Sequence, residues 1–577
     1  MKKHINVLGI LGFVRDPAAC LVRDGKIIAV AEEERFVRIK HANGLFPKNA
    51  IKFCLDYGKI AVKDVDFIAI AWDTKKYPGR MAEIYLENWY KYKITDEKTL
   101  QWHIKMLREY DHDKYGQRIV DGLAECGFNK DDTPPIKFVE HHYSHAVSAY
   151  YCSGFKEASV ITIDGHGEEN CTVLWEVRNK TFKKVKEFNI PHSMGWFYAA
   201  FTKFAGFEIY DGEGKLMGLA PYGKPNKKIR EHINELCKTT NDGYEIDPSY
   251  LFYYKRTYAD EYSDKFVEVF GKGRNKDEFI TDYYKNVAYE AQNKLEETGL
   301  NLAKYIVEKT GIKNLCLAGG VALNCKMNGH IWKNLELNNI FIQPMSSDEG
   351  AALGAAIAVS IEAGCDVENL IMHHVYFGPE YTNEETKKSL DFANVKYEYI
   401  EEVEKETSKL IADGKIIGWF QGRMEVGPRA LGNRSILVDP RRSEMKDIVN
   451  NKVKFRESWR PFCPSILDEY KEDYLENAYY HPFMILTFFV KEEKRDEIPA
   501  VVHVDGTARP QTIKKDVNPK YWKLIDEFRK LTNVPVLLNT SFNIKGEPIV
   551  CSPQDAINCF LKTGIDVLVL GNYIIKK

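Results

Sequence analysis

The chain has 577 residues, of which 44% are hydrophobic, and 81 basic and 83 acidic residues give it a formal net charge of −2. This length exceeds a single compact core, so we expect two or three domains. The balanced charge excludes a general attraction to nucleic acid or to an anionic membrane, so any anionic ligand must be held by a local cluster of cations.

Targeting and redox signals are missing from the sequence. The 12 cysteines form no CxxC pair, and no apolar run approaches the roughly 20 residues of a membrane helix. The first residues continue into a strand pattern instead of a cleavage site. We therefore expect a cytoplasmic protein with reduced cysteines and with neither a membrane nor a nucleic acid as partner.

The first half of the chain alternates strand and helix patterns. Asp24-Gly25, between two apolar runs, predicts a hairpin turn. A related pattern returns in residues 159–177 and indicates a weak duplication of strand, acidic turn and strand. Residues 314–324 and 340–356 each predict a strand, a turn and a helix. This alternation predicts an α/β fold.

The character of the sequence changes near Phe377, where a charged stretch leads into the apolar run Lys415–Gln421. We place a domain boundary between about 370 and 395. The predicted domains are residues 1–375 and 376–577.

Two histidines and two aspartates are candidate metal ligands. His141 and His145 lie four residues apart, so on a helix their imidazoles share one face. Asp164 ends an apolar strand pattern, and Asp348 stands at a predicted helix start, where ligands gather in α/β folds. This set suits a divalent transition metal with open positions, iron(II) among the candidates. The alternative is that Asp348 only caps its helix and Asp164 only serves its turn.

Two glycine-rich stretches, Gly212–Gly223 and Ala318–Asn324, predict turns beside regular structure. Backbone amides in such turns can approach phosphate. Glycine also makes ordinary tight turns, so neither stretch alone indicates a nucleotide.

The densest group of cations lies between Gly422 and Arg460. Guanidinium groups bind phosphate and carboxylate through paired hydrogen bonds. These side chains alternate with Gly, Pro, Trp459 and Phe462, which argues against a plain solvated helix face. We interpret them as a site for a small phosphorylated substrate, together with Arg509 and the polar stretch Asn539–Asn543. The cations of the group are Arg423, Arg429, Arg434, Lys452, Lys454, Arg456 and Arg460.

At these residues the sequence resembles the O-carbamoyltransferase family of nodulation-factor, cephalosporin and aminoglycoside enzymes. The resemblance covers essentially the whole chain. It rests on these motifs in order: DPAACLVRDGKIIAVAEEERFVRIKH, HHYSHAVSAYY, DGHGEE, GEGKLMGLAPYG, AGGVALNCKMNG, SSDEGAALGAA, GRMEVGPRALGNRSIL, RPFCP and NTSFN.

The resemblance implies an α/β protein with an N-terminal actin-like (ASKHA) ATPase-type domain and a C-terminal YrdC-like domain. It also implies two steps. The C-terminal domain converts carbamoyl phosphate and ATP to carbamoyl-adenylate, with Mg²⁺ as a candidate companion of ATP. The N-terminal domain then passes the carbamoyl group to a hydroxyl of a small, sugar-containing acceptor.

Roles follow from the resemblance by motif position. The implied iron ligands and catalytic residues are His141, His145, Asp164 and Asp348. The implied contacts to carbamoyl phosphate and the adenylate are Arg429, Arg460, Arg509, Asn539 and Ser541. The implied ATP contacts are Lys40, Gly319, Gly320 and Asn324.

One position departs from the family pattern. Many relatives have His before the aspartate of the first loop, whereas this chain has Arg15 before Asp16. That loop is implicated in acceptor binding, so Arg15 favours an anionic acceptor. The alternative is that Arg15 only packs or pairs at the surface.

Two other functions remain open from the sequence. A threonylcarbamoyl-type tRNA-modifying enzyme has similar folds, but it needs a basic surface that the charge balance does not supply. A non-catalytic sugar or nucleotide sensor on the ASKHA fold would not need the C-terminal arginines. The acceptor, the metal and any homo-oligomer are not determined by the sequence.

Overall fold

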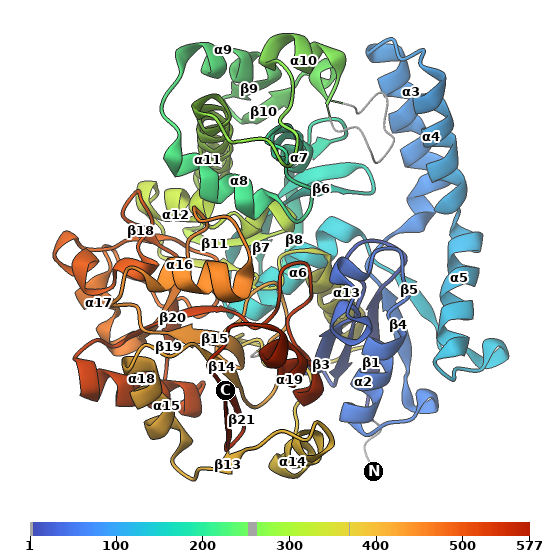
Figure 1. Ribbon diagram of the computed structural model, residues 1–577. Helices are drawn as coiled ribbons and strands as arrows, with labels where there is room; N and C mark the ends of the chain where they lie inside the picture. Colours follow the sequence, from blue (N-terminus) through green and yellow to red (C-terminus); the bar gives the residue numbers. More distant parts are fainter. Residues whose placement is uncertain (1–3, 252–261, 369) are drawn as a thin grey trace. The chain divides into compact units, whose positions relative to one another are not determined.

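The computed structural model describes residues 4–251, 262–368 and 370–577 (Figure 1). Contacts divide the chain into two compact units. The first unit comprises Met1–Val14, Ala18–Ile28 and Phe46–Ile371, and the second comprises Arg15–Pro17, Ala29–Leu45 and Met372–Lys577. Two short N-terminal segments thus belong with the C-terminal residues, an arrangement that a single sequence boundary does not show.

The first unit contains two sheets with the same strand order, except that the residues of the edge strand β3 from Ala29 onward are counted with the second unit. One has the order β3-β2-β1-β4-β5. The other, read from the corresponding edge, has the order β8-β7-β6-β11-β12. In each, one central strand pairs antiparallel with the next strand in sequence and parallel with a later one. The strands are β1 (Asn6–Leu11), β2 (Ala18–Arg23), β3 (Lys26–Glu32), β4 (Phe67–Ile70), β5 (Ile136–Phe138), β6 (Ala158–Gly167), β7 (Asn170–Arg178), β8 (Thr181–Asn189), β11 (Asn314–Ala318) and β12 (Asn339–Ile342). The predicted duplication is confirmed, and the repeated order is the actin-like arrangement that the resemblance implied.

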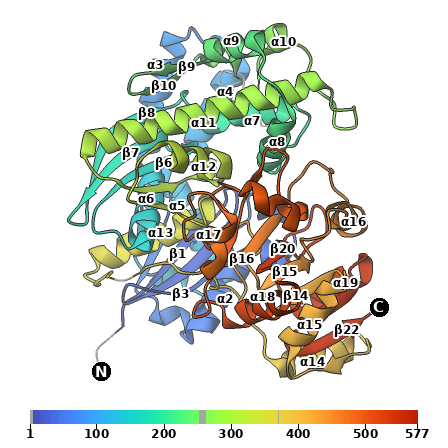
Figure 2. The ribbon, with the colours of Figure 1, turned by 90° about the vertical axis from the view of Figure 1, so that its left-hand side faces the viewer.

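Helices fill the space between and around these sheets. α6 (His141–Ser153) packs on β6 and β11, while α13 (Asp348–Glu362) packs on β1 and β2 and on α6. The long helix α11 (Asp282–Thr310) crosses the second sheet together with α7 (Met194–Phe204), as Figure 2 shows. Because α13 is rich in alanine and glycine, its backbone can approach both neighbours closely.

The two glycine-rich stretches differ in structure. Residues 212–223 were predicted to form a turn, and this prediction is wrong, because Glu213–Leu219 form helix α8. Leu216 and Met217 are buried on that helix, and this burial outweighs the weak helix preference of Gly214. The second stretch does turn sharply, with Gly319 at φ +91°.

The second unit is built on one mixed sheet of eight strands in the order β13-β22-β21-β14-β15-β20-β16-β19. The strands are β13 (Glu398–Tyr399), β14 (Ile417–Phe420), β15 (Arg434–Val438), β16 (Cys463–Leu467), β19 (Gln511–Ile513), β20 (Val536–Ser541), β21 (Val567–Leu570) and β22 (Tyr573–Lys576). Helices α15 (Val403–Ala412) and α18 (Pro519–Thr532) pack against each other in this unit. The α/β class is therefore confirmed for both units.

Residues 29–45, here called the strap, are attached to the second unit by charge and by packing. Arg35 is buried, forms ion pairs with Glu32 and Glu34, and donates to the carbonyl of Gly427 at 2.9 Å. Glu32 accepts from the Gly427 amide at 3.0 Å. Phe36 packs on an apolar cluster formed by Met424, Ala430, Ile549 and Cys551. Lys40 therefore belongs to the same unit as the C-terminal arginines.

Among the described helices, none has the length and apolar composition needed to cross a bilayer.

Candidate active site

The four predicted ligands meet in the first unit. The Nε2 atoms of His141 and His145 lie 3.1 Å apart. His145 Nε2 lies 3.2 Å from Asp164 Oδ2, and His141 Nε2 lies 3.6 Å from Asp348 Oδ1. One ligand atom from each residue falls within 4.8 Å of all the others. Both histidines are fully buried, whereas the aspartates retain side-chain exposures of 16% and 20%, so the centre is reached from the carboxylate side.

Local backbone structure aims these side chains. His141 is the first residue of α6, and His145 follows one turn later on the same face. Asp348 is the first residue of α13. Asp164 lies inside β6 rather than beyond its end, at a register shift between Ile163 and Gly167. The irregular strand therefore turns this carboxylate toward the start of the helix.

The predicted ATP residues of the first unit have structural partners here. The amide of Gly320 donates to Asp164 Oδ2 at 3.1 Å, and a Cβ on Gly319 would overlap the main chain of Ile163. Asn324 caps α12 (Cys325–Asn334) by accepting from Met327 N at 3.0 Å. These residues position Asp164 and the following helix, and their contact with ATP stays a prediction.

Hydrogen bonds to the other ring nitrogens orient the histidines. His141 Nδ1 lies 3.2 Å from the Ala71 carbonyl, to which it donates, and this bond leaves Nε2 as the ring nitrogen that faces the centre. His142, between the two candidates, bonds Thr162 Oγ1 at 2.9 Å and the Asn170 carbonyl at 3.0 Å. His142 therefore faces away from the centre, as its place in the helix requires.

Electrostatics in the centre favour a bound cation. Burial alone lowers the pKa of His141, but Asp164 and Asp348 outweigh burial and raise the pKa to about 9. Burial opposes the charge of Asp164, yet the two histidines hold its pKa well below the ordinary range. Burial and the neighbouring His141 lower the pKa of His145. Asp164 thus stays charged and recruits positive charge.

The donor set fits a divalent transition metal. Bonds of about 2.0–2.2 Å hold neighbouring nitrogen and oxygen ligands roughly 3–3.5 Å apart. The separations of 3.1, 3.2 and 3.6 Å come close to this range without a large rearrangement. Two imidazoles and one carboxylate are a typical set for non-haem iron(II), and here a second carboxylate lies beside them.

Glu168, which sequence reasoning missed, holds the first residue of α6 at the centre. Its fully buried carboxylate accepts from the His141 amide at 3.1 Å and from the Asp73 amide at 2.7 Å. Burial raises the pKa of Glu168 to about 7. Its place in the DGHGEE motif, directly after Gly167, was the available signal.

A second candidate site gathers cations in the second unit. Lys454 is 5% exposed and donates to the Ser541 carbonyl at 2.8 Å and to the Asn543 carbonyl at 3.1 Å. Burial, and then the charges of Arg456, Arg460 and Lys40, hold the pKa of Lys454 well below its usual range.

The pKa of Arg456 indicates the same excess of positive charge. Burial, followed by the charges of Arg460 and Arg509, lowers the pKa of Arg456 to about 9. Cations that depress each other's pKa values in this way are suited to a polyanion, which would neutralise them. The predicted residues Lys40, Arg460 and Arg509 therefore contribute to one electrostatic cluster.

The remaining predicted residues surround this cluster or lie elsewhere in the same unit. Arg509 donates to Cys463 Sγ from Nε at 3.2 Å and Nη2 at 3.0 Å. Ser541 Oγ donates to Asn543 Oδ1 at 2.8 Å, and the buried Asn539 donates to Ser465 Oγ at 3.0 Å. Arg460 Nη1 lies 4.0 Å from Glu457 Oε2, and Arg429 is half-buried. The candidate acceptor residue Arg15 has its Nε 3.6 Å from Asp16 Oδ2.

Arg434 was grouped with the phosphate-binding cations, but its surroundings are structural. It is fully buried, stacks 3.6 Å above the Phe420 ring, and donates to the carbonyls of Gln421 and Pro379. Glu425, which sequence reasoning missed, accepts from the Leu431 amide at 2.6 Å and from the Arg434 amide at 3.1 Å. Together they fold the loop that presents Arg429.

Family models match both parts of the chain. The model described as carbamoyltransferase N-terminus matches residues 6–357, and the model described as carbamoyltransferase C-terminus matches residues 408–577. This chain belongs to the carbamoyltransferase family. The resemblance stated from the motifs is thereby confirmed, and the protein is a carbamoyltransferase enzyme.

Carbamoyltransferase relatives share nearly the full length. The match to an uncharacterized protein of Synechocystis has 39% identity and covers 99% of this chain and 97% of that protein. The nodulation protein NolNO of Sinorhizobium fredii is 39% identical over 100% of this chain and 81% of the relative. Among solved structures, component A of the Acidaminococcus fermentans (R)-2-hydroxyglutaryl-CoA dehydratase matches 62% of this chain and 99% of its own at 15% identity and a TM-score of 0.33, a likeness too weak to support an argument.

Proposed function

We propose that this carbamoyltransferase is an ATP-dependent O-carbamoyltransferase with two chemically distinct sites. The second unit makes carbamoyl-adenylate, and the centre of the first unit assists transfer of the carbamoyl group to an acceptor hydroxyl. The observation that carries the proposal is the division of chemistry. Buried cations around Lys454 and Arg456 lie in one unit, while the imidazole and carboxylate donors lie in the other.

Adenylate formation requires the binding of two phosphorylated substrates. Water hydrolyses carbamoyl phosphate to carbamate and inorganic phosphate, and a carbamate oxygen then attacks the α-phosphorus of ATP and displaces pyrophosphate. Lys454, Arg456 and Arg460 would neutralise the phosphates in a water-poor pocket, where electrostatic stabilisation is strong. Arg429, Arg509, Asn539 and Ser541 are proposed as further contacts to the carbamoyl group and the adenylate. Lys40, carried by the strap, is proposed to contact ATP.

Transfer requires attack by the acceptor oxygen on the carbamoyl carbon, with AMP as the leaving group. A mixed anhydride with AMP has a better leaving group than a carbamate ester has. His141, His145, Asp164 and Asp348 would hold the divalent metal, which when bound supplies Lewis-acid polarisation. Iron(II) is the proposed ion, because the donor set matches its preferences.

The proposed acceptor is a small hydroxylated molecule that contains a sugar. The similarity to nodulation proteins, together with the motif resemblance, supports this class. Arg15 is a candidate acceptor contact. Its side chain is 19% exposed and lies beside Asp16, so a negatively charged acceptor group would have to compete with that carboxylate.

The decisive experiment separates the two steps. Pyrophosphate release is measured with ATP in the presence and absence of carbamoyl phosphate. The wild type should release pyrophosphate only when both are present, and Arg429→Ala should lose that release, because removing a phosphate-binding guanidinium costs several kcal/mol. Arg442→Ala removes an exposed arginine of the same unit and should behave as wild type. Full release by Arg429→Ala would refute the assignment of that residue, and release that ignores carbamoyl phosphate would refute the function.

A further inference from the structure

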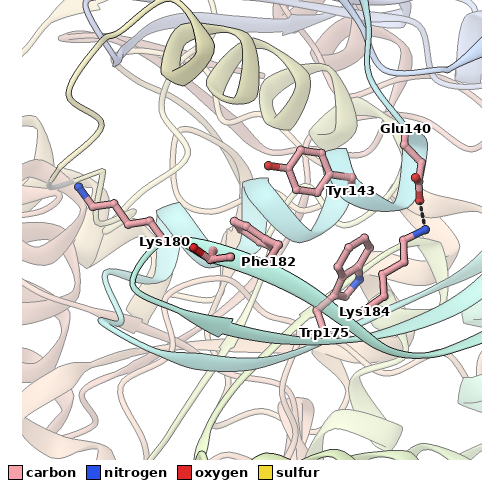
Figure 3. Close-up of a pocket in the computed structure, with 7 residues that line it drawn as sticks. Glu140, Tyr143, Trp175, Lys180, Phe182 and Lys184 are labelled. Atoms are coloured by element: carbon pink, nitrogen blue, oxygen red, sulfur yellow. Dashed lines mark ion pairs between the residues drawn. The ribbon is translucent and has the colours of Figure 1, made fainter.

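The first unit carries a cavity that the proposed reaction does not use. It has a volume of about 550 Å³, within the roughly 300–1,000 Å³ of small-molecule sites. It opens between α6 and the β7-β8 hairpin (Figure 3). It is lined by Glu140, Tyr143, Trp175, Lys180, Phe182 and Lys184, with Thr181.

This cavity is separate from the metal centre. Tyr143 lies two residues after His141 and two before His145 in the same helix, so it projects from the opposite side of α6. A molecule that contacts Tyr143 therefore has the helix between itself and the metal ligands. The cavity is a candidate second site and not an extension of the centre.

Aromatic rings form one part of the lining. Tyr143 lies with its ring centroid 5.2 Å from that of Phe182 and 6.0 Å from that of Trp175. In Figure 3 the hydroxyl of Tyr143 points into the space above Phe182. Such rings offer broad apolar surface to the carbon face of a ligand, and the tyrosine adds a polar group at its edge.

Charges in the cavity cancel in pairs. Lys184 lies 2.7 Å from Glu140 and 2.8 Å from Glu187, and Glu140 also lies 3.2 Å from Lys76. Lys180, at the other end, lies 2.9 Å from Glu368. A phosphate or carboxylate ligand would need uncompensated cations, as in the cluster around Lys454. Paired charges instead offer donors and acceptors together, which suits hydroxyl groups.

We propose that this aromatic cavity binds a neutral saccharide unit through Tyr143, Phe182 and the Lys184–Glu140 pair. The hydroxyls would bond the charged pair, while the ring carbons would rest against the aromatic side chains. This binding is independent of the proposed carbamoyl transfer, because the cavity lies on the other side of α6.

The test measures binding without catalysis. Saturation-transfer NMR and calorimetry are carried out on the full chain with glucose, maltose and cellobiose, and with glucose 6-phosphate for comparison. At least one neutral sugar should bind, and Tyr143→Ala and Phe182→Ala should each weaken it roughly tenfold, as the loss of an aromatic contact predicts. Lys184→Ala should weaken binding as well.

Matched controls lie on the surface of the same unit. Tyr90→Ala removes a tyrosine that is 90% exposed, and Lys183→Ala removes the lysine next to Lys184. Both variants should bind the sugar as the wild type does. Circular dichroism confirms that each variant is folded, and Phe182→Leu provides a milder change if Phe182→Ala unfolds. Absence of binding by every neutral sugar, tighter binding of glucose 6-phosphate, or equal binding by the cavity variants would each overturn the proposal.

Discussion

Gly354 of α13 lies directly against Ser144 of α6, and a Cβ at Gly354 would overlap the Ser144 carbonyl oxygen. Ser144 immediately precedes His145, and α13 begins at Asp348. The close contact of these two helices therefore sets the distance between a candidate imidazole ligand and a candidate carboxylate ligand. Only glycine allows this approach.

Gly354→Ala should consequently weaken both the fold and the metal centre. Forcing a methyl group into this contact should cost about 1–3 kcal/mol of unfolding free energy and move the helices apart. Thermal unfolding and calorimetric titration with a divalent ion measure the two effects. Gly116→Ala in α5 (His112–Glu125) is the control, because a Cβ there meets no atom within 4 Å and should stabilise by about 0.4–1 kcal/mol. Unchanged metal affinity in Gly354→Ala would contradict the inference that the contact between α6 and α13 sets the distance between the candidate ligands.

His145→Ala should remove bound metal and abolish carbamoyl transfer, while pyrophosphate release persists. The reason is that the ligand set and the cation cluster lie in different units. Elemental analysis and the two half-reaction assays provide the measurements. His142→Ala is the control, since this neighbour faces Thr162 and should lower stability without removing metal. Metal content equal to wild type in His145→Ala would show that His145 is not a ligand.

Glu425→Ala should disorder the loop that carries Arg429. The substitution leaves the buried amides of Leu431 and Arg434 without their acceptor, at a cost of about 3 kcal/mol or more. Urea unfolding should report that loss, and carbamoyl phosphate-dependent pyrophosphate release should fall with it. The exposed Glu444→Ala serves as control. Wild-type stability in Glu425→Ala would mean that the loop is held by other contacts.

Binding of ATP near pH 9 should take up protons through Arg456. Its pKa in the folded protein is about 9, below the ordinary arginine value of 12.5, and a bound polyanion should raise it again. Calorimetry in buffers with different ionisation enthalpies measures the uptake, which should shrink toward pH 7, where Arg456 is protonated with or without ATP. Arg456→Gln should reduce the uptake, whereas Arg442→Gln should not.

The same shift fixes the sign of the stability change with pH. Above about pH 9 the unfolded chain holds a proton on Arg456 that the folded protein has released, so this residue increases stability as pH rises through that value. Below that pH the cost of burying the charged Arg456 near other cations persists as a constant penalty. Proton uptake at pH 9 that is equal in Arg456→Gln and wild type would contradict this account.

The sequence brought out the four candidate ligands more readily than the residues that support them. The spacing of His141 and His145 has a direct meaning on a helix, and Asp164 and Asp348 followed strand and helix boundary signals. Glu168 and its bond to a backbone amide depend on a register shift in β6, which no periodicity reveals. Likewise, the burial of Arg434 depends on Phe420, a distant partner that composition cannot identify.

Helix α8 (Glu213–Leu219) was missed for the same reason, because its conformation depends on contacts that are distant in the sequence. Local glycine content favoured a turn, but the burial of Leu216 and Leu219 decides the conformation. The close contact at Gly354 also depends on which helix lies opposite it.

The strap gives the polypeptide an interlaced architecture. Because residues 29–45 belong to the second unit while residues 46–371 belong to the first, no single cut of the gene can yield two whole halves. A fragment that starts at Met372 would expose the apolar surface that Phe36 covers and would leave Gly427 without Arg35 and Glu32. Separate expression of the C-terminal residues would therefore give an incomplete product that is prone to aggregate, so the path of the chain favours a single reading frame for both units.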